Sequence, residues 1–308
     1  MGFFFQGYNA ISILGFFALV LALIVLNELT RRSKKFSIFM YVIVPIILVI
    51  LIALKVVESP SSKTWFGVIK TYSALAGVIG FMFIRYTKVE HTKFALWFPV
   101  TILGINILEA IYREFEVFIT YKTLTVDAAG ITMLGGVWNI FNAIAGIFLL
   151  ITMTGWVGIK VAKTKSRDMV WADQLWFWII AYDLWNIAYC YNCISTRSMY
   201  SGVVLIVSCT VAEFVLKRGI WLQHRAQTLA LFGMFSIAVD YQALPMCGIT
   251  ATYNPLAWTV LSAIALAFNF GVFVYELIVI IKTKRNPIKE ELYIDLKAYK
   301  KNLEANRL

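Results

Sequence analysis

The chain has 308 residues, 60% of them hydrophobic, and a mean hydropathy of +0.77. Because soluble domains contain about 45–50% apolar residues, this composition excludes an ordinary soluble protein. The net charge of +11 does not indicate a nucleic-acid partner, since the Lys and Arg residues lie in short loops between apolar segments, where membrane topology places them.

Apolar segments long enough to cross a bilayer recur along the whole chain. A spanning helix needs about 20 predominantly apolar residues, and windows of that length predict an all-α, polytopic transmembrane bundle of nine helices. The seventh window is short and the eighth opens on the polar run QHRAQT, so a count of eight remains open. The nine windows are residues 10–29, 36–57, 65–85, 94–117, 133–157, 171–193, 201–217, 221–243 and 256–281.

The distribution of basic residues between the loops tests this count. With the N-terminus outside, most of the 28 basic residues fall on the inside, as the positive-inside rule requires. Omitting one helix would scramble this segregation. We therefore predict a transmembrane bundle over residues 1–282, with its N-terminus outside, and a cytoplasmic tail over residues 283–308.

The predicted tail is basic and amphipathic. Apolar residues alternate with charges there, as expected for a helix that lies on a membrane surface, and anionic lipids of the inner leaflet are its predicted partner. Docking to a soluble cytoplasmic partner is the alternative. The apolar positions of the tail are Ile288, Leu292, Ile294, Leu296 and Tyr299.

Two of the predicted helices carry a stripe of polar side chains. Both stripes have spacings of 3, 4 and 3 residues, which place the side chains on one face of an α-helix. The stripe on the helix at 94–117 comprises Asn106, Glu109, Arg113 and Glu116. The stripe on the helix at 171–193 comprises Asp183, Asn186, Cys190 and Cys193.

Ionisable side chains at mid-bilayer cost about 2.5–3.5 kcal/mol each on insertion scales, so they face a partner or a water-filled cavity. Glu109 and Asp183 are expected near the midplane. Arg113 follows Glu109 by four residues and can neutralise it, or it can reach Asp183, which has no basic residue within reach on its own helix. We predict one polar cavity that binds a substrate or ion, formed by Asp183, Glu109, Arg113, Asn106, Asn186, Asn269, Asn139, Asn142 and Asp240.

The remaining chemical motif is a C-x-x-C pair, Cys190 and Cys193, at the predicted outer end of its helix. Together with Cys247 of an outer loop, this pair can exchange disulfides on the oxidising side of the membrane. Alternatively, the two cysteines are small residues on one packing face. The sequence has neither the paired histidines of a haem site nor a lysine for a retinal Schiff base, and we predict no cofactor and no metal site.

The run LWFPVTILGINILEAIYREFE, with the nine-helix layout, resembles uncharacterised bacterial inner-membrane proteins of unknown function. The resemblance implies a multi-pass location in the plasma membrane and says nothing about a substrate. From the residues, the leading hypothesis is a transporter of a small polar solute or ion, in which buried carboxylates couple to a cation or proton, since secondary transporters bind both near the midplane. Two alternatives remain open: an integral-membrane enzyme that acts on thiols or lipids, and a non-catalytic receptor or assembly subunit.

Overall fold

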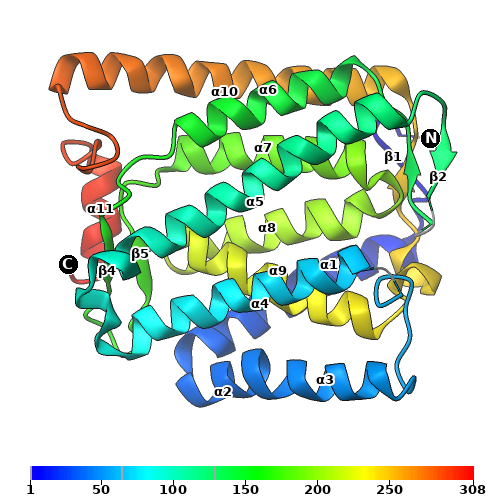
Figure 1. Ribbon diagram of the computed structural model, residues 1–308, viewed down its shortest axis with the longest axis horizontal. Coiled ribbons are helices and arrows are strands. Elements are labelled where there is room, and N and C mark those ends of the chain that lie inside the picture. Colours follow the sequence, from blue (N-terminus) through cyan, green and yellow to red (C-terminus); the bar gives the residue numbers. More distant parts are fainter. Residues whose placement is uncertain (1, 64, 128–129) are drawn as a thin grey trace.

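A computed structural model describes residues 2–63, 65–127 and 130–308. Long helices run in roughly one direction and form a bundle (Figure 1), with the N-terminus, β1 and β2 at one end and α11, β4 and β5 at the other. The helices are α1 (Ala10–Arg32), α2 (Lys34–Ile38), α3 (Val44–Ala53), α4 (Trp65–Tyr86), α5 (Lys93–Thr120), α6 (Val137–Ile151), α7 (Trp176–Cys193), α8 (Val204–Val211), α9 (Trp221–Ala238), α10 (Pro255–Thr283) and α11 (Lys297–Ala305).

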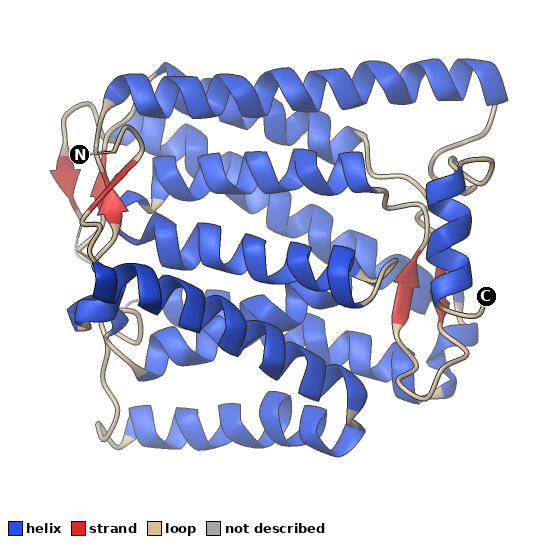
Figure 2. Ribbon diagram, turned by 180° about the vertical axis from the view of Figure 1, so that it is seen from behind, coloured by secondary structure: helices blue, strands red, loops and turns tan. Residues whose placement is uncertain are grey.

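Short antiparallel strand pairs cap both ends of the bundle (Figure 2). In the described part of the chain, β1 pairs with β6, β2 with β3 and β4 with β5. The strands are β1 (Phe5–Gln6), β2 (Thr125–Val126), β3 (Thr132–Met133), β4 (Ile159–Val161), β5 (Met169–Trp171) and β6 (Thr250–Ala251).

Six helical segments of the described chain are long and apolar enough to cross a membrane. By length and composition the protein is therefore an all-α, multi-pass membrane protein. Helix α6 is apolar but shorter, with 15 residues, and α7 and α9 have 18 residues each. The six segments are Ala10–Arg32, Lys34–Ala53, Gly67–Tyr86, Ala95–Thr120, Met199–Leu216 and Pro255–Thr283.

Each of the nine predicted windows contains a helix, but several windows were too long, and in two of them the excess includes a strand. The fifth window, 133–157, begins in β3 and runs past the end of α6 at Ile151. The sixth begins at Trp171, which pairs with Ile159 in the β4–β5 hairpin. In both places a short apolar strand continues the apolar run of a helix, and hydropathy alone does not separate the two.

The second predicted helix is continuous but irregular. A π-helical turn, η1 (Phe39–Ile43), joins α2 to α3, and Pro45 follows at the start of α3. Proline has no N–H and clashes with the preceding turn, and a wider π turn is one way for a helix to absorb such an interruption. Segment Met199–Leu216 similarly begins with the π turn η4 (Met199–Val203) and ends with the π turn η5 (Ala212–Leu216).

Helix α7 lies inside the bundle, whereas α10 and the α2–α3 segment lie along opposite edges (Figure 1). Most side chains of α7 are buried. Large apolar side chains of the edge helices are exposed, among them Ile46 of α3 at 57% and Ile281 of α10 at 72%. Apolar surface on this scale indicates contact with lipid.

The C-terminal tail packs against the bundle. Leu292 and Tyr299 were expected to face the membrane surface, but they are buried in a cluster with Val170 of β5 and Leu175. Ile288 and Ile294 remain exposed. The tail is therefore folded against the end of the bundle that carries the β4–β5 hairpin. After α10 ends at Thr283, α11 (Lys297–Ala305) is the one α-helix of the described tail.

Asp173 holds the tail in place. Its carboxylate accepts hydrogen bonds from the backbone N–H groups of Leu292 (2.9 Å) and Tyr293 (2.8 Å) and from the hydroxyl of Thr154 (2.5 Å). Asp173 is 1% exposed, and this burial raises the pKa of its carboxyl, an effect that the three hydrogen bonds oppose. One buried acid thus satisfies two donors of a segment with little regular structure.

Candidate functional site

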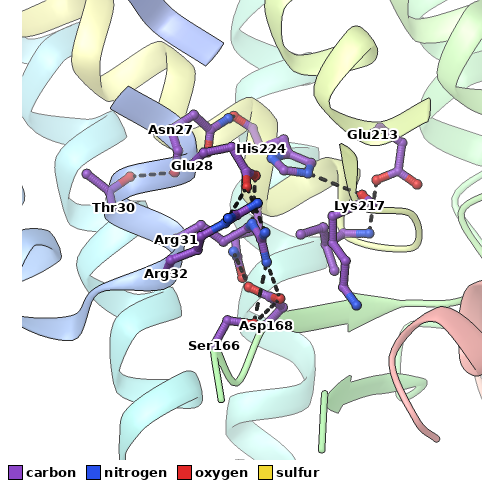
Figure 3. A network of polar contacts seen from close by, with 12 residues as sticks. Asn27, Glu28, Thr30, Arg31, Arg32, Ser166, Asp168, Glu213, Lys217 and His224 are labelled. Carbon is purple, nitrogen blue, oxygen red and sulfur yellow. Dashed lines mark hydrogen bonds and ion pairs between the residues drawn. The ribbon is translucent and has the colours of Figure 1, made fainter. Parts of the chain in front are cut away.

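The first polar cluster joins the ends of α1, α4 and α9 to the β4–β5 turn (Figure 3), and Asp168 is its centre. The Asp168 carboxylate is fully buried. It accepts hydrogen bonds from Arg31 (2.8 Å), Ser166 (2.6 Å) and Gln223 (3.1 Å). Burial raises the pKa of this carboxyl, but the charges of Arg31 and Arg85 outweigh the effect and hold the pKa below its ordinary value.

Arg85 fixes the backbone around this cluster. Its guanidinium lies 3.6 Å from Asp168 and donates to the carbonyl oxygens of Arg31 (2.6 Å), Ser166 (2.9 Å) and Arg167 (3.2 Å). With 1% of its surface exposed, Arg85 ties three segments together through backbone acceptors. The arrangement is that of a structural clamp.

Two other acids near the Asp168 cluster, Glu28 and Glu213, also bond to residues close to them in the sequence. Glu28 pairs with Arg31 (2.7 Å) and Arg32 (2.8 Å), as their sequence spacing predicts. Glu213 accepts from the backbone N–H groups of Gly219 (2.5 Å) and Ile220 (3.1 Å). The carboxylate thus holds the turn between η5 and α9.

The polar stripe of α5 contacts different partners from those predicted. Glu109 forms an ion pair with Lys70 of α4 (2.9 Å), and Lys70 also reaches Asn106 (3.5 Å). Arg113 pairs with Glu116 (2.6 Å). Of the two partners considered for Arg113, Glu109 is not bonded to it among the described residues, because Lys70 approaches Glu109 from a neighbouring helix. The stripe is half-buried, with the Glu109 side chain 41% exposed, and the exposed face of α5 is the apolar one that carries Leu108 and Tyr112.

Asp183 lies at the interface of α7 with α8 and α9. It accepts a hydrogen bond from Thr210 of α8 (2.8 Å), and its second oxygen has no partner in the described part of the chain. The predicted contact with Arg113 is not formed in the described residues. The nearby cation is Arg225 of α9, which donates to Asn186 (3.4 Å) and lies over the ring of Tyr182.

Two other predicted site residues lie apart from these groups. Asn269 of α10 donates to the carbonyl oxygens of Ala181 (3.1 Å) and Ala265 (2.9 Å), which makes it an interhelical packing contact. Asp240 follows α9 and is exposed. The nine predicted residues therefore belong to several separate groups.

A second fully buried acid is Glu114 of α5, which the sequence analysis missed. It is 0% exposed and accepts hydrogen bonds from the carboxamides of Asn139 (2.6 Å) and Asn142 (2.7 Å) of α6 and Asn192 (3.2 Å) of α7. Asn192 also donates to Ser262 of α10 (3.1 Å). Within the described chain, none of the ion pairs involves Glu114.

The helical spacing of apolar residues in α5 indicates that Glu114 is buried. Glu114 follows Ile107 by seven residues and Ala110 by four, and both of these are buried. An acid in register with the apolar face of a helix, rather than with its polar stripe, is expected to point into the core. Asp168 had no such signal, because it lies in a loop among basic residues.

The cysteines are enclosed. Cys190, Cys193, Cys209 and Cys247 are free thiols, and none of them is more than 8% exposed. Burial raises the pKa of Cys247, which lies in a loop. Disulfide exchange needs an accessible thiolate, so this burial counts against the thiol-redox alternative.

Comparison with known proteins identifies a family for this chain but does not assign it an activity. No curated protein matches the chain, and no solved structure matches it. A family model described as a family of unknown function (DUF5692) matches residues 6–305. The match covers nearly the whole chain, so the protein belongs to the DUF5692 family of unknown function.

Proposed function

We propose that the protein is a membrane transporter for a cation or small polar solute, and that Glu114 is its coupling carboxyl. The supporting observation is the position of Glu114, which is fully buried between α5, α6 and α7 and bonded by three asparagine amides. In a low-dielectric interior a carboxylate without a cation is costly. A bound proton or a bound metal cation removes that cost.

The geometry around Glu114 suits exchange between these two states. Three amide donors stabilise the ionised carboxylate. The amide oxygens of Asn142 and Asn192 have no partner among the described residues. Carboxylate and amide oxygens are ligands for hard cations. A protonated Glu114 donates its own O–H to one of these oxygens once that amide turns, because its nitrogen faces the carboxylate here.

Asp183 and Arg225 supply a second polar contact surface in this proposal. Asp183 has one oxygen without a partner, and Arg225 has one guanidinium nitrogen without a partner, in the part of the chain that the structure describes. Both side chains are at most 7% exposed. A polar solute with both a donor and an acceptor satisfies such a pair.

The proposal includes nine passes, with the N-terminus outside and the C-terminus inside a bacterial plasma membrane. A helix in each predicted window supports this topology, as does the position of the two termini at opposite ends of the bundle (Figure 1). Arg31, Arg85 and Lys160 lie at the end that carries α11, which agrees with a cytoplasmic location for that end.

The coupling role can be tested without knowing the solute. In proteoliposomes, jumps in Na⁺, K⁺ or pH should produce transient charge movements on a solid-supported membrane. Glu114→Gln should abolish them, because its neutral side chain neither binds a cation nor exchanges a proton. Glu116→Gln is the matched control on the same helix, since Glu116 is 39% exposed and pairs with Arg113.

Infrared difference spectroscopy gives a second measurement at the same group. Exchange of Na⁺ for choline, or a rise in pH, should change the band of a protonated carboxyl in the wild type. The change should be missing in Glu114→Gln and present in Glu116→Gln. Identical signals in the wild type and Glu114→Gln would exclude Glu114 as the coupling group.

A further inference from the structure

A cavity of 260 Å³ lies at the end of the bundle that carries α11. It is half open and is bordered by the start of α7, the η5 turn and α11. The side chains relevant to its chemistry are Gln174, Trp176, Arg218, Lys297, Lys301 and Glu213. Pockets for drug-sized ligands measure about 300–1,000 Å³. This cavity therefore suits a small group.

The amide of Gln174, a residue of the cavity wall, has no hydrogen-bond partner among the described residues. The side chain is 5% exposed, and neither its amide nitrogen nor its amide oxygen has a hydrogen-bond partner in the described chain. A buried amide with both groups unsatisfied is rare, because each costs about 1–3 kcal/mol. A ligand with oxygen acceptors and a hydroxyl satisfies both once the amide, which is closed off from solvent, turns toward the cavity.

Two helix N-termini open on the same cavity. Leu175 and Trp176 are the N-cap and first residue of α7, and Lys297 and Ala298 are the first residues of α11. Neither helix has a side-chain cap, so their first N–H groups are free to donate. Helix N-termini carry partial positive charge and bind phosphate and other anions.

Three cations complete the site. Arg218, Lys297 and Lys301 line the cavity, and none forms an ion pair with the residues that the structure describes. Glu213 is the one acid of the lining, and both its oxygens already accept backbone N–H groups. The lining therefore has an excess of positive charge.

We propose that this cavity binds the phosphate headgroup of an anionic phospholipid. The apolar rim supports a lipid as the source of the phosphate: Trp176, which lines the cavity, is 57% exposed, and Val215, which follows the lining residue Phe214 in η5, is 73% exposed. Trp residues at a helix end anchor it at the membrane interface, and basic pockets on the cytoplasmic side bind anionic headgroups. Acyl chains of the bound lipid lie along this rim.

The test uses the full-length protein in detergent. Binding of phosphatidylglycerol, phosphatidylcholine and free glycerol 3-phosphate is measured by native mass spectrometry and by the shift in unfolding temperature. Phosphatidylglycerol should bind and stabilise the protein. Equal effects of phosphatidylcholine overturn the proposal, and equal affinity for glycerol 3-phosphate overturns a lipid source.

Two triple variants with the same charge change separate the cavity from surface charge. Arg218→Gln/Lys297→Gln/Lys301→Gln should lower phosphatidylglycerol affinity about 100-fold, since each basic residue near an anionic surface contributes roughly a factor of five. The control changes three exposed cations outside the cavity to Gln and should retain the affinity. Equal losses in both variants overturn the proposal. The control residues are Lys282, Lys284 and Lys289.

Gln174→Leu gives an outcome that a structural role does not produce. Removing an unsatisfied amide should raise the unfolding temperature of the lipid-free protein. The same change should reduce the shift that phosphatidylglycerol causes. A variant that keeps the full shift contradicts the assignment of Gln174 to the site.

Discussion

Arg31, in the last turn of α1, donates a 2.8 Å hydrogen bond to Asp168 in the turn before β5, and the two side chains are 7% and 0% exposed. This buried ion pair connects residues 137 positions apart. Removing one partner of a buried pair leaves an uncompensated charge. Arg85 lies 3.6 Å from the same carboxylate and loses its counter-charge as well.

We therefore expect Asp168→Asn to lower the free energy of unfolding by about 3–5 kcal/mol. The four cysteines are free and buried, so a thiol-reactive fluorophore reports unfolding in detergent. The matched control is Glu58→Gln, which removes an exposed ion pair with Lys63 and should leave the transition unchanged. Equal transitions for all three proteins would mean that the Asp168 cluster does not hold the bundle end.

The Asp168 pair also predicts a pH dependence. Its folded-state pKa is below the ordinary value of 3.8, so its stabilising effect is fully present above pH 3.8 and is lost as the pH falls through the folded-state pKa. Asp173 titrates with the opposite sign, because burial raises its pKa. The measurement is therefore the difference in stability between wild type and Asp168→Asn, which should shrink as the pH falls below 3.8. A constant difference would contradict the prediction.

Asp173 predicts how firmly the tail is attached. Asp173→Ala leaves the N–H groups of Leu292 and Tyr293 without their acceptor, at about 1–3 kcal/mol for the loss. Limited trypsin digestion of the tail should then be about 5- to 150-fold faster. Asp295→Ala is the control, because Asp295 is 71% exposed and pairs only with Arg285 among the described residues. Similar rates for the two variants would show that Asp173 does not restrain the tail.

The positions of the helices could be predicted from apolar windows, because lipid requires such runs. The ion-pair and hydrogen-bond partners that side chains find on other helices could not be predicted in this way. Glu109 has Arg113 four residues away, yet it pairs with Lys70 from α4, and only the packing of α4 on α5 determines that choice. The strand at Trp171 was missed because it pairs with Ile159 through tertiary contacts. Glu114 was predictable from its register with the buried face, whereas its three asparagine partners come from two other helices.

At Gly219, where the bundle meets α11, we expect stability to be sensitive to the addition of a side chain. Its φ of +82° is unfavourable for an L-residue, and an added Cβ would lie 3.0 Å from the Asn306 amide nitrogen and 3.1 Å from Asn302. Gly219→Ala should destabilise the protein by about 1–3 kcal/mol. Gly130→Ala is the control, since Gly130 has a φ of +74° and no neighbour within 4 Å. Equal losses in the thiol-labelling assay would assign the cost to the backbone, and a larger loss at Gly219 would assign it to contact with α11.

The cluster around Glu114 predicts opposite effects of two substitutions. Glu114→Gln keeps one acceptor oxygen, its NH2 donates to Asn142 once that amide turns its oxygen inward, and it removes a buried charge, so its unfolding temperature should equal or exceed that of the wild type. Glu114→Leu has a similar size but accepts nothing, and the amides of Asn139, Asn142 and Asn192 are then unpaired, at about 1–3 kcal/mol each. Its unfolding temperature should fall well below that of the wild type. If the Leu variant were as stable as the Gln variant, the carboxylate would not organise these helices. A stable but inactive Gln variant would instead show that the buried charge is retained for function at the expense of stability.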